Sequence, residues 1–172
     1  MIIYEFIDPK KIRRAALYAA CIVVMLTLQE NVLARVSVFG VRASPMPALI
    51  AAIGLFEGGL WGGLFGVFAG FFSDMAGANT RVLLTIILAA MGFLSGLVGQ
   101  LLINRRFYSY MVAAAVILLA ASLCQALPVW VYHRASPLAL LRTAALQALW
   151  SVPFAVPCYF ACRAIAGQKF KE

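Results

Sequence analysis

The sequence predicts an all-α polytopic membrane protein that folds as a single six-helix transmembrane bundle over residues 1–172. Hydrophobic residues make up 65% of the chain, and the mean hydropathy is +0.97. Only 12% of the residues are charged, about half the share of an average soluble domain. The apolar residues also form runs of helical length, separated by short polar or proline-containing segments. A soluble fold could not bury this much apolar surface.

We expect the first helix at residues 14–34 and the second at residues 45–56. Pro45 and Pro47 suit the first turn of the second helix, because the missing N–H has no partner there anyway. At ~1.5 Å per residue this helix would be only ~18 Å long, against a bilayer core of ~30 Å. It would have to tilt, begin earlier near Val41, or lie where the bilayer is thin.

The remaining helices are expected at residues 58–75, 80–103, 108–131 and 138–166. The third helix is rich in glycine, which is unfavourable in an isolated helix in water but useful for packing in a bilayer. Pro153 and Pro157 lie within the sixth helix and should kink or break it, because each removes a backbone donor.

An even number of spans places both termini on one side of the membrane. That side would hold Lys10, Lys11, Arg13, Arg14, Arg105, Arg106, Arg163, Lys169 and Lys171. The other side would hold Arg35, Arg42, Arg81, Arg134 and Arg142. The excess of basic residues beside the termini predicts that both face the cytoplasm. The net charge of +8 then serves orientation and contact with anionic lipids rather than nucleic acid.

Small residues form two rows on the third helix. The first row, at four-residue spacing, consists of Gly58, Gly62, Gly66 and Gly70. The second row, at heptad spacing, consists of Gly59, Gly63, Gly66, Gly70, Ser73 and Gly77. The fourth helix offers a small face of its own in Gly92, Ser95, Gly96 and Gly99. Small residues let helix backbones approach closely, so we expect this face to dock a neighbouring helix, with a partner protein or a flat ligand as the alternative.

Two carboxylates flank the third helix. Glu57 and Asp74 are 17 residues apart, or ~25 Å along a helix, so both should lie at membrane interfaces. The helix dipole favours an anion at the N-terminus, which suits Glu57, and disfavours one near the C-terminus. Asp74 therefore needs a partner, and Arg81 is the nearest candidate in the sequence.

A polar cluster near the end of the first helix contains Gln29, Glu30 and Asn31. Together with Asp74 and Asn79 it could form a polar pocket beneath the outer loops. The alternative is that these residues simply end the first helix at the interface.

The residue types that carry catalysis are sparse. His133 is the single histidine, and there is no nucleophile motif, paired inward carboxylate or metal-ligand spacing. The cysteines lie in apolar runs, as small buried hydrophobic residues do; they are Cys21, Cys124, Cys158 and Cys162. We therefore expect no enzyme, metal or cofactor. A channel or proton-coupled carrier is also disfavoured, because such proteins need ionisable residues at membrane depth.

The order of features over about residues 26–76 carries a family resemblance. The stretch LTLQENVLARVSVFGVRASPMPAL leads into the short second helix, and LFEGGLWGGLFGVFAGFFSDM follows. This order resembles the MreD family of rod-shape-determining membrane proteins. That family has an LQ, a loop ending in G-(V/I)-(R/K)-P-(D/S), and a helix leading to G…GxxxGxxxGxxxD. Later helices match in length, hydropathy and the pattern GFLSGLVG. The loop here reads GVRASPMP, without the usual acid beside the proline.

The resemblance implies a non-catalytic scaffold in the bacterial cytoplasmic membrane. The partners it implies are an MreC-like bitopic protein, the peptidoglycan synthase and transpeptidase of the rod complex, and the actin-like MreB filament. The implied fold resembles the six-helix substrate-binding subunits of energy-coupling-factor vitamin transporters.

That similarity of fold supplies a second functional hypothesis, a transporter subunit. Its outer pocket would hold a small molecule and would consist of Gln29, Glu30, Asp74, Asn79 and Trp130. The stretch AALYAA in the first helix has in part the small-residue spacing used to dock a coupling subunit. The scaffold hypothesis is favoured because its motif has more parts in a fixed order. A lytic pore protein is disfavoured by the six long spans and the glycine packing face.

Overall fold

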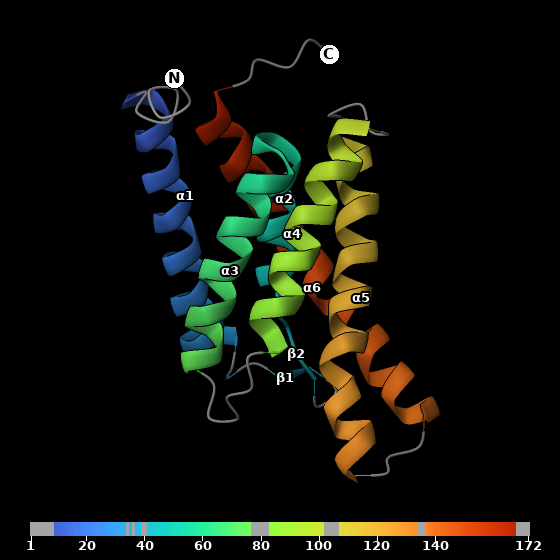
Figure 1. The fold of residues 1–172 in the computed structure, drawn as a ribbon. Helices are drawn as coiled ribbons and strands as arrows, with labels where there is room; N and C mark the ends of the chain where they lie inside the picture. The colour runs from blue at the N-terminus through green and yellow to red at the C-terminus, as the bar shows by residue number, and fades with distance from the viewer. Residues whose placement is uncertain are drawn as a thin grey trace.

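The computed structural model describes residues 9–33, 35, 37–38, 41–76, 83–101, 107–133 and 137–167. The described residues form six α-helices: α1 (Pro9–Leu28), α2 (Met46–Glu57), α3 (Gly59–Ala76), α4 (Leu83–Leu101), α5 (Phe107–His133) and α6 (Pro137–Ala166). The helices run alternately up and down, so the start of α1 and the end of α6 lie at the same end of the molecule (Figure 1). The all-α prediction is confirmed.

The ends of the helices differ from the predicted bounds at a few places. The first helix begins at Pro9 rather than at residue 14, and it ends in a π-helical turn, η2 (Gln29–Leu33). The sixth helix continues through Pro153 and Pro157, so of the two predicted effects, a break or a kink, the break is wrong. Prolines are tolerated in a packed apolar helix where neighbouring groups satisfy the backbone.

Between α1 and α2 lies a small antiparallel hairpin of β1 (Ser37–Val38) and β2 (Val41–Arg42), with Val38 opposite Val41. Because Val41 lies in a strand, the alternative that the second helix begins near this residue is wrong. The helix begins at Met46, with Pro45 as its N-cap. The carbonyl of Pro45 accepts hydrogen bonds from the N–H groups of Ala48 and Leu49.

The short helix α2 forms the centre of the bundle, where every residue from 46 to 56 is buried. All five of the other helices pack around it. Because α2 is enclosed by the other helices, its short length is compatible with a central position in the bundle. The non-helical residues before it, including the buried Ala43 and Pro45, extend its path inside the bundle.

A serine of α6 accepts a hydrogen bond from the non-helical backbone that precedes α2. The N–H of Ser44 donates to Ser151 Oγ at 2.9 Å, and Ser151 Oγ donates to the carbonyl of Gln147 at 2.8 Å. Ser151 is fully buried. A buried backbone N–H without a partner would be costly, so this one side chain joins the entry of α2 to the middle of α6.

One residue, Gly58, reverses the chain from α2 into α3. Its φ of 99° lies in the left-handed region, which only glycine adopts readily. Its N–H donates to the carbonyl of Gly54, and its carbonyl accepts from the N–H of Gly62. Gly54 and Gly62 let the backbones of α2 and α3 come into contact directly after the turn. A Cβ on Gly62 would lie only 2.6 Å from the Cα of Gly54.

Beyond the turn, α3 and α4 pack backbone to backbone. A Cβ on Gly66 would lie 2.8 Å from the Cα of Ala89, and one on Gly70 would lie 2.9 Å from the backbone nitrogen of Thr85. Real side chains do not come this close to a backbone. In contrast, a Cβ on Gly63 would lie 3.6 Å from the Cβ of Phe93, an ordinary contact. The close backbone contact with α4 is therefore made by the side of α3 that carries Gly66 and Gly70 and not at Gly63.

The outer surface of the bundle is apolar. Its exposed large side chains on α1, η2 and α3 include Leu17, Val24, Val32, Leu60, Leu64, Phe71 and Met75. Exposed hydroxyls bond to their own helix, as Thr27 Oγ1 does to the carbonyl of Val24 and Thr143 Oγ1 to that of Leu140. In the described part of the chain, the helical segments Ile12–Leu33 and Leu138–Ala166 are long and apolar enough to cross a membrane.

We expect Gly66→Ala to destabilise the protein by about 1–3 kcal/mol or more, because the added methyl group meets backbone atoms of α4 that cannot rotate away. Gly63→Ala is the matched control and should leave stability within about 0.5 kcal/mol. Thermal unfolding in detergent, followed by size-exclusion chromatography of the heated samples, measures both. Equal melting temperatures for the two variants would contradict the packing described here.

We expect Ser151→Ala to cost about 1–3 kcal/mol, because the buried N–H of Ser44 then lacks an acceptor. Thr143→Ala, on the exposed part of the same helix, should change stability little, since its hydroxyl bonds only to its own helix. The same unfolding assay compares the two variants. A neutral Ser151→Ala would mean that another group satisfies Ser44.

Candidate functional site

The small residues singled out from the sequence lie at the junction of α2, α3 and α4. A Cβ added to any of these glycines would meet atoms at this junction. The glycines are Gly59, Gly62, Gly63, Gly66, Gly70, Gly92, Gly96 and Gly99. A partner helix could not reach the tight contacts without displacing α4. Ser73 is buried, and its Oγ has no hydrogen-bond partner among the described residues, while Gly77 lies outside them.

Sequence analysis missed one member of this junction, Gly54. A Cβ on Gly54 would lie 2.5 Å from the carbonyl oxygen of Gly92, so α2 and α4 also touch through their backbones. The signal was present, since Gly54 continues the four-residue spacing backward from Gly58. It was hidden because the spacing crosses a helix boundary.

Asp74 has a partner, and that partner is the first turn of α4. Its Oδ2 accepts the backbone N–H of Thr85 at 3.0 Å and the hydroxyl of Thr85 at 2.6 Å. The first N–H groups of a helix have no partner within the helix and attract an anion. Asp74 therefore caps α4, which explains an acid near the end of α3. The predicted partner Arg81 lies outside the described residues, as does Asn79.

The predicted outer polar pocket is not joined by hydrogen bonds in the described part of the chain. Glu30 is exposed, and the buried Oε1 of Gln29 accepts no hydrogen bond from a residue that the structure describes. Asn31 Nδ2 donates to the carbonyl of Thr27 in its own helix. These residues complete the turn at the end of α1, while Asp74 is held by α4.

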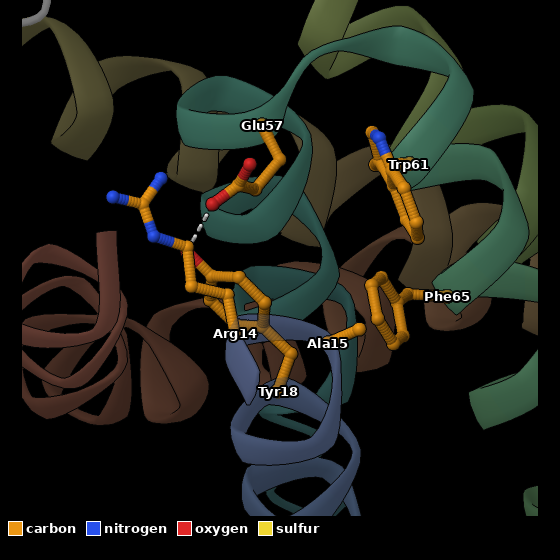
Figure 2. Close-up of a pocket in the computed structure, with 6 residues that line it drawn as sticks. All are labelled: Arg14, Ala15, Tyr18, Glu57, Trp61 and Phe65. Carbon is orange, nitrogen blue, oxygen red and sulfur yellow. Dashed lines mark hydrogen bonds between the residues drawn. The ribbon is translucent and has the colours of Figure 1, made fainter. Parts of the chain in front are cut away.

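The second flanking carboxylate, Glu57, lies at a corner between α1, α2 and α3. It is the last residue of α2 rather than part of α3, which begins at Gly59. Tyr18 of α1 donates its hydroxyl to Glu57 Oε1 at 3.0 Å (Figure 2). This contact ties α1 to the turn at Gly58. The sequence prediction placed Glu57 before the third helix, as observed, but it did not foresee that Glu57 ends α2, whose dipole disfavours an anion there. It also did not identify Tyr18.

A pocket of about 260 Å³ opens beside this hydrogen bond. Figure 2 shows the residues that line it, which are Arg14, Ala15, Tyr18, Glu57, Trp61 and Phe65. The rings of Trp61 and Phe65 are stacked with centroids 6.0 Å apart, and Tyr18 meets Phe65 edge-on at 5.8 Å. The pocket thus combines a guanidinium, a carboxylate and an aromatic wall. The sequence signal for it was the spacing of Glu57, Trp61 and Phe65 at four-residue intervals.

An apolar groove of about 220 Å³ lies beside this pocket, between α1 and α3. Its lining residues are Ala19, Trp61, Leu64, Phe65 and Phe68. Trp61 and Phe65 line both cavities. A polar pocket and an apolar groove are therefore neighbours along α3.

A separate hollow of about 420 Å³ lies between α5 and α6. Among the residues that line it are Ser122, Gln125, Thr143 and Gln147. Gln147 Nε2 donates to Gln125 Oε1 at 3.5 Å. None of the described side chains that line this hollow is ionisable, so these side chains offer hydrogen bonds but no charge.

Chemistry at a metal or a thiolate has little support in the described residues. No group of three or more His, Cys, Asp or Glu side chains gathers among them. Cys158 and Cys162 are buried in the core. The side chains of Trp130 and His133 are not among those described.

No protein-family model, curated protein or solved structure matches the chain. Functional inference therefore starts from the ordered sequence motif and the geometry of the bundle.

We expect Asp74→Ala to cost about 1–2 kcal/mol, the usual effect of removing a helix cap. Asp74→Asn should cost less, because its amide oxygen can still accept from Thr85. Glu30→Ala removes an exposed acid near the end of α1 and serves as the control. Thermal unfolding in detergent ranks the three variants. An unchanged melting temperature for Asp74→Ala would show that the cap adds no stability.

Proposed function

We propose that this protein is a non-catalytic scaffold subunit of the bacterial cell-elongation complex, spanning the cytoplasmic membrane six times with both termini inside. The observation that carries the proposal is the ordered motif over about residues 26–76. Its parts are an LQ, a loop with glycine, a basic residue and proline, a short helix, and a glycine ladder ending in Asp74.

The structural positions of the motif residues support a framework role. The loop proline Pro45 caps α2, and Gly58 makes the turn into α3. Gly66 and Gly70 pack closely against the backbone of α4, and Asp74 caps the first turn of that helix. The matched segment thus builds the central junction of the bundle. A rigid framework suits a protein that holds partners in fixed positions.

The lengths and surfaces of the helices support an embedded bundle. The 27 residues of α5 and the 30 residues of α6 correspond to ~40 and ~45 Å, more than the ~30 Å bilayer core. The C-terminal end of α5 and the N-terminal end of α6 extend beyond α3 and α4 on the side away from the start of α1 (Figure 1). The short α2 is enclosed by protein, so it needs no contact with lipid.

Partner contacts in this proposal lie on the outward faces of the bundle. The glycine junction is filled by α4, so a single-helix MreC-like partner would meet exposed apolar residues such as those of α1 and α3. The basic residues at the end with the termini would meet anionic lipids, the MreB filament or the synthase and transpeptidase.

The alternative function is a substrate-binding subunit of an energy-coupling-factor transporter. One observation favours it, since Ala16 and Ala20 lie exposed one helical turn apart on α1, as a docking face for a coupling subunit would. Against it, Asp74 is bound to Thr85 and Glu30 is exposed. Two of the residues expected to hold a ligand are thus not assembled into a pocket.

Co-purification from the native membrane tests the proposal. The tagged protein should bring down MreC-like and cell-wall-synthase proteins, and its depletion should turn rod-shaped cells round. Gly63→Ala should restore both properties, whereas Gly66→Ala should restore neither, because it disrupts the junction. Recovery of an ATPase pair with a coupling membrane subunit, and loss of micronutrient uptake, would identify the transporter instead.

A further inference from the structure

We propose that the corner between α1, α2 and α3 binds a phospholipid with a primary-ammonium headgroup, phosphatidylethanolamine. The headgroup occupies the pocket beside Glu57, and one acyl chain lies in the neighbouring apolar groove, which shares Trp61 and Phe65 with that pocket. This site goes beyond the scaffold role and depends only on the chain lying in a bilayer.

The carboxylate of Glu57 is the acceptor for the ammonium group. Its Oε1 accepts the hydroxyl of Tyr18, while Oε2 has no hydrogen bond to any residue that the structure describes. Figure 2 shows this second oxygen directed away from Tyr18. An ammonium group carries three donors, and a charge-assisted bond to a carboxylate is about twice as strong as a neutral one.

The aromatic wall favours the same cation. Trp61 and Phe65 line the pocket together with Glu57, and the faces of such rings attract ammonium groups within about 6 Å. A carboxylate and aromatic faces around one small pocket are the elements by which proteins recognise amines. When Arg14 of the same pocket is bound to the lipid phosphate, a headgroup without a cation, such as glycerol, would leave Glu57 without a cationic partner.

Arg14 supplies the matching group for the phosphate. Its side chain lines the pocket and is exposed. Its Nη2 also lies near the end of α6, 3.8 Å from where a Cβ on Gly167 would be. A guanidinium can bind two oxygens of one phosphate at once. A pocket with one anion and one cation is complementary to the zwitterionic phosphoethanolamine group.

The groove below has the properties of an acyl-chain site. Its walls are apolar side chains of α1 and α3, such as Ala19, Leu64 and Phe68. It shares Trp61 and Phe65 with the headgroup pocket, so one molecule can occupy both. From Trp61 to Phe68 the wall follows α3 away from the end that holds the start of α1. An acyl chain takes this course from a headgroup at the interface toward the bilayer centre.

Lipid titration by native mass spectrometry of the full chain tests the site. The purified, delipidated protein receives phosphatidylethanolamine, phosphatidylglycerol or phosphatidylcholine with identical acyl chains. We expect phosphatidylethanolamine to bind about tenfold more tightly than phosphatidylglycerol, as one charge-assisted hydrogen bond allows. Phosphatidylcholine should also bind more weakly than phosphatidylethanolamine, since its trimethylammonium group has no N–H donor. Equal affinities for all three lipids in the wild-type protein would overturn the proposal.

Three variants separate the contributions of the headgroup contacts. Glu57→Gln keeps an oxygen for Tyr18 but removes the charge, so the preference for phosphatidylethanolamine over phosphatidylglycerol should disappear. Arg14→Gln should weaken both lipids equally, because both carry the phosphate. Trp61→Leu should weaken phosphatidylethanolamine more than phosphatidylglycerol, because it removes the ring that attracts the cation.

Matched controls exclude a general effect of lost charge or lost aromatic surface. Glu30→Gln removes an acid near the other end of α1, and Phe71→Leu removes an exposed ring of α3 outside the groove; both should bind as the wild type does. The melting temperature of each variant without lipid shows whether it folds. Arg14→Gln changes an exposed side chain, so it tests the site even if Glu57→Gln fails to fold. A Glu57→Gln protein that folds and keeps the lipid preference would refute the site. Since no partner protein takes part, failure here leaves the scaffold proposal untouched.

Discussion

Backbone contact between α2, α3 and α4 is the constraint around which the rest of the bundle is arranged. At Gly54, Gly62 and Gly92 the helices meet without intervening side chains. In lipid, helices gain nothing from leaving water, so they associate through close packing. The approach of three backbones fixes α2 at the centre, and the longer helices then cover it. A methyl group at one of these glycines would force helices apart and disturb every contact outside them.

Hydrogen bonds between helices fix the positions at which the packed helices meet. Glycine contacts alone tolerate sliding of one helix along another, whereas a buried donor must meet its acceptor. Tyr18 holds α1 to Glu57 at one end, and Asp74 holds α3 to Thr85 at the other. In the core, the hydroxyl of Tyr110 contacts the carbonyls of Ala48 and Ala155 at 3.1 and 3.2 Å, joining α5 to α2 and α6. Such bonds set the register of the helices.

The bundle therefore separates its packing surface from its binding surface. The small-residue face of α3 packs against α4 inside the molecule, so the tight contacts there leave no room for another protein. The corner at Glu57 remains open because Gly58 turns the chain there and leaves space beside α1 (Figure 2). In the proposed arrangement, its charges would lie where a bilayer presents headgroups. The proposed scaffold would then hold a lipid at this corner and leave its outward apolar faces to partner helices.

Hydropathy and local chemistry were enough to predict the helices, since apolar runs and the proline at Pro45 depend on neighbouring residues alone. The small-residue spacing of α3 likewise predicted tight packing, because glycine has few other uses in an apolar helix. Only the tertiary structure decided which helix fills that face and that the shortest helix is the central one. It also decided that Asp74 caps α4 and that Tyr18 reaches Glu57. These contacts join residues from different helices, and their distances depend on how the helices cross, which no local pattern in the chain encodes.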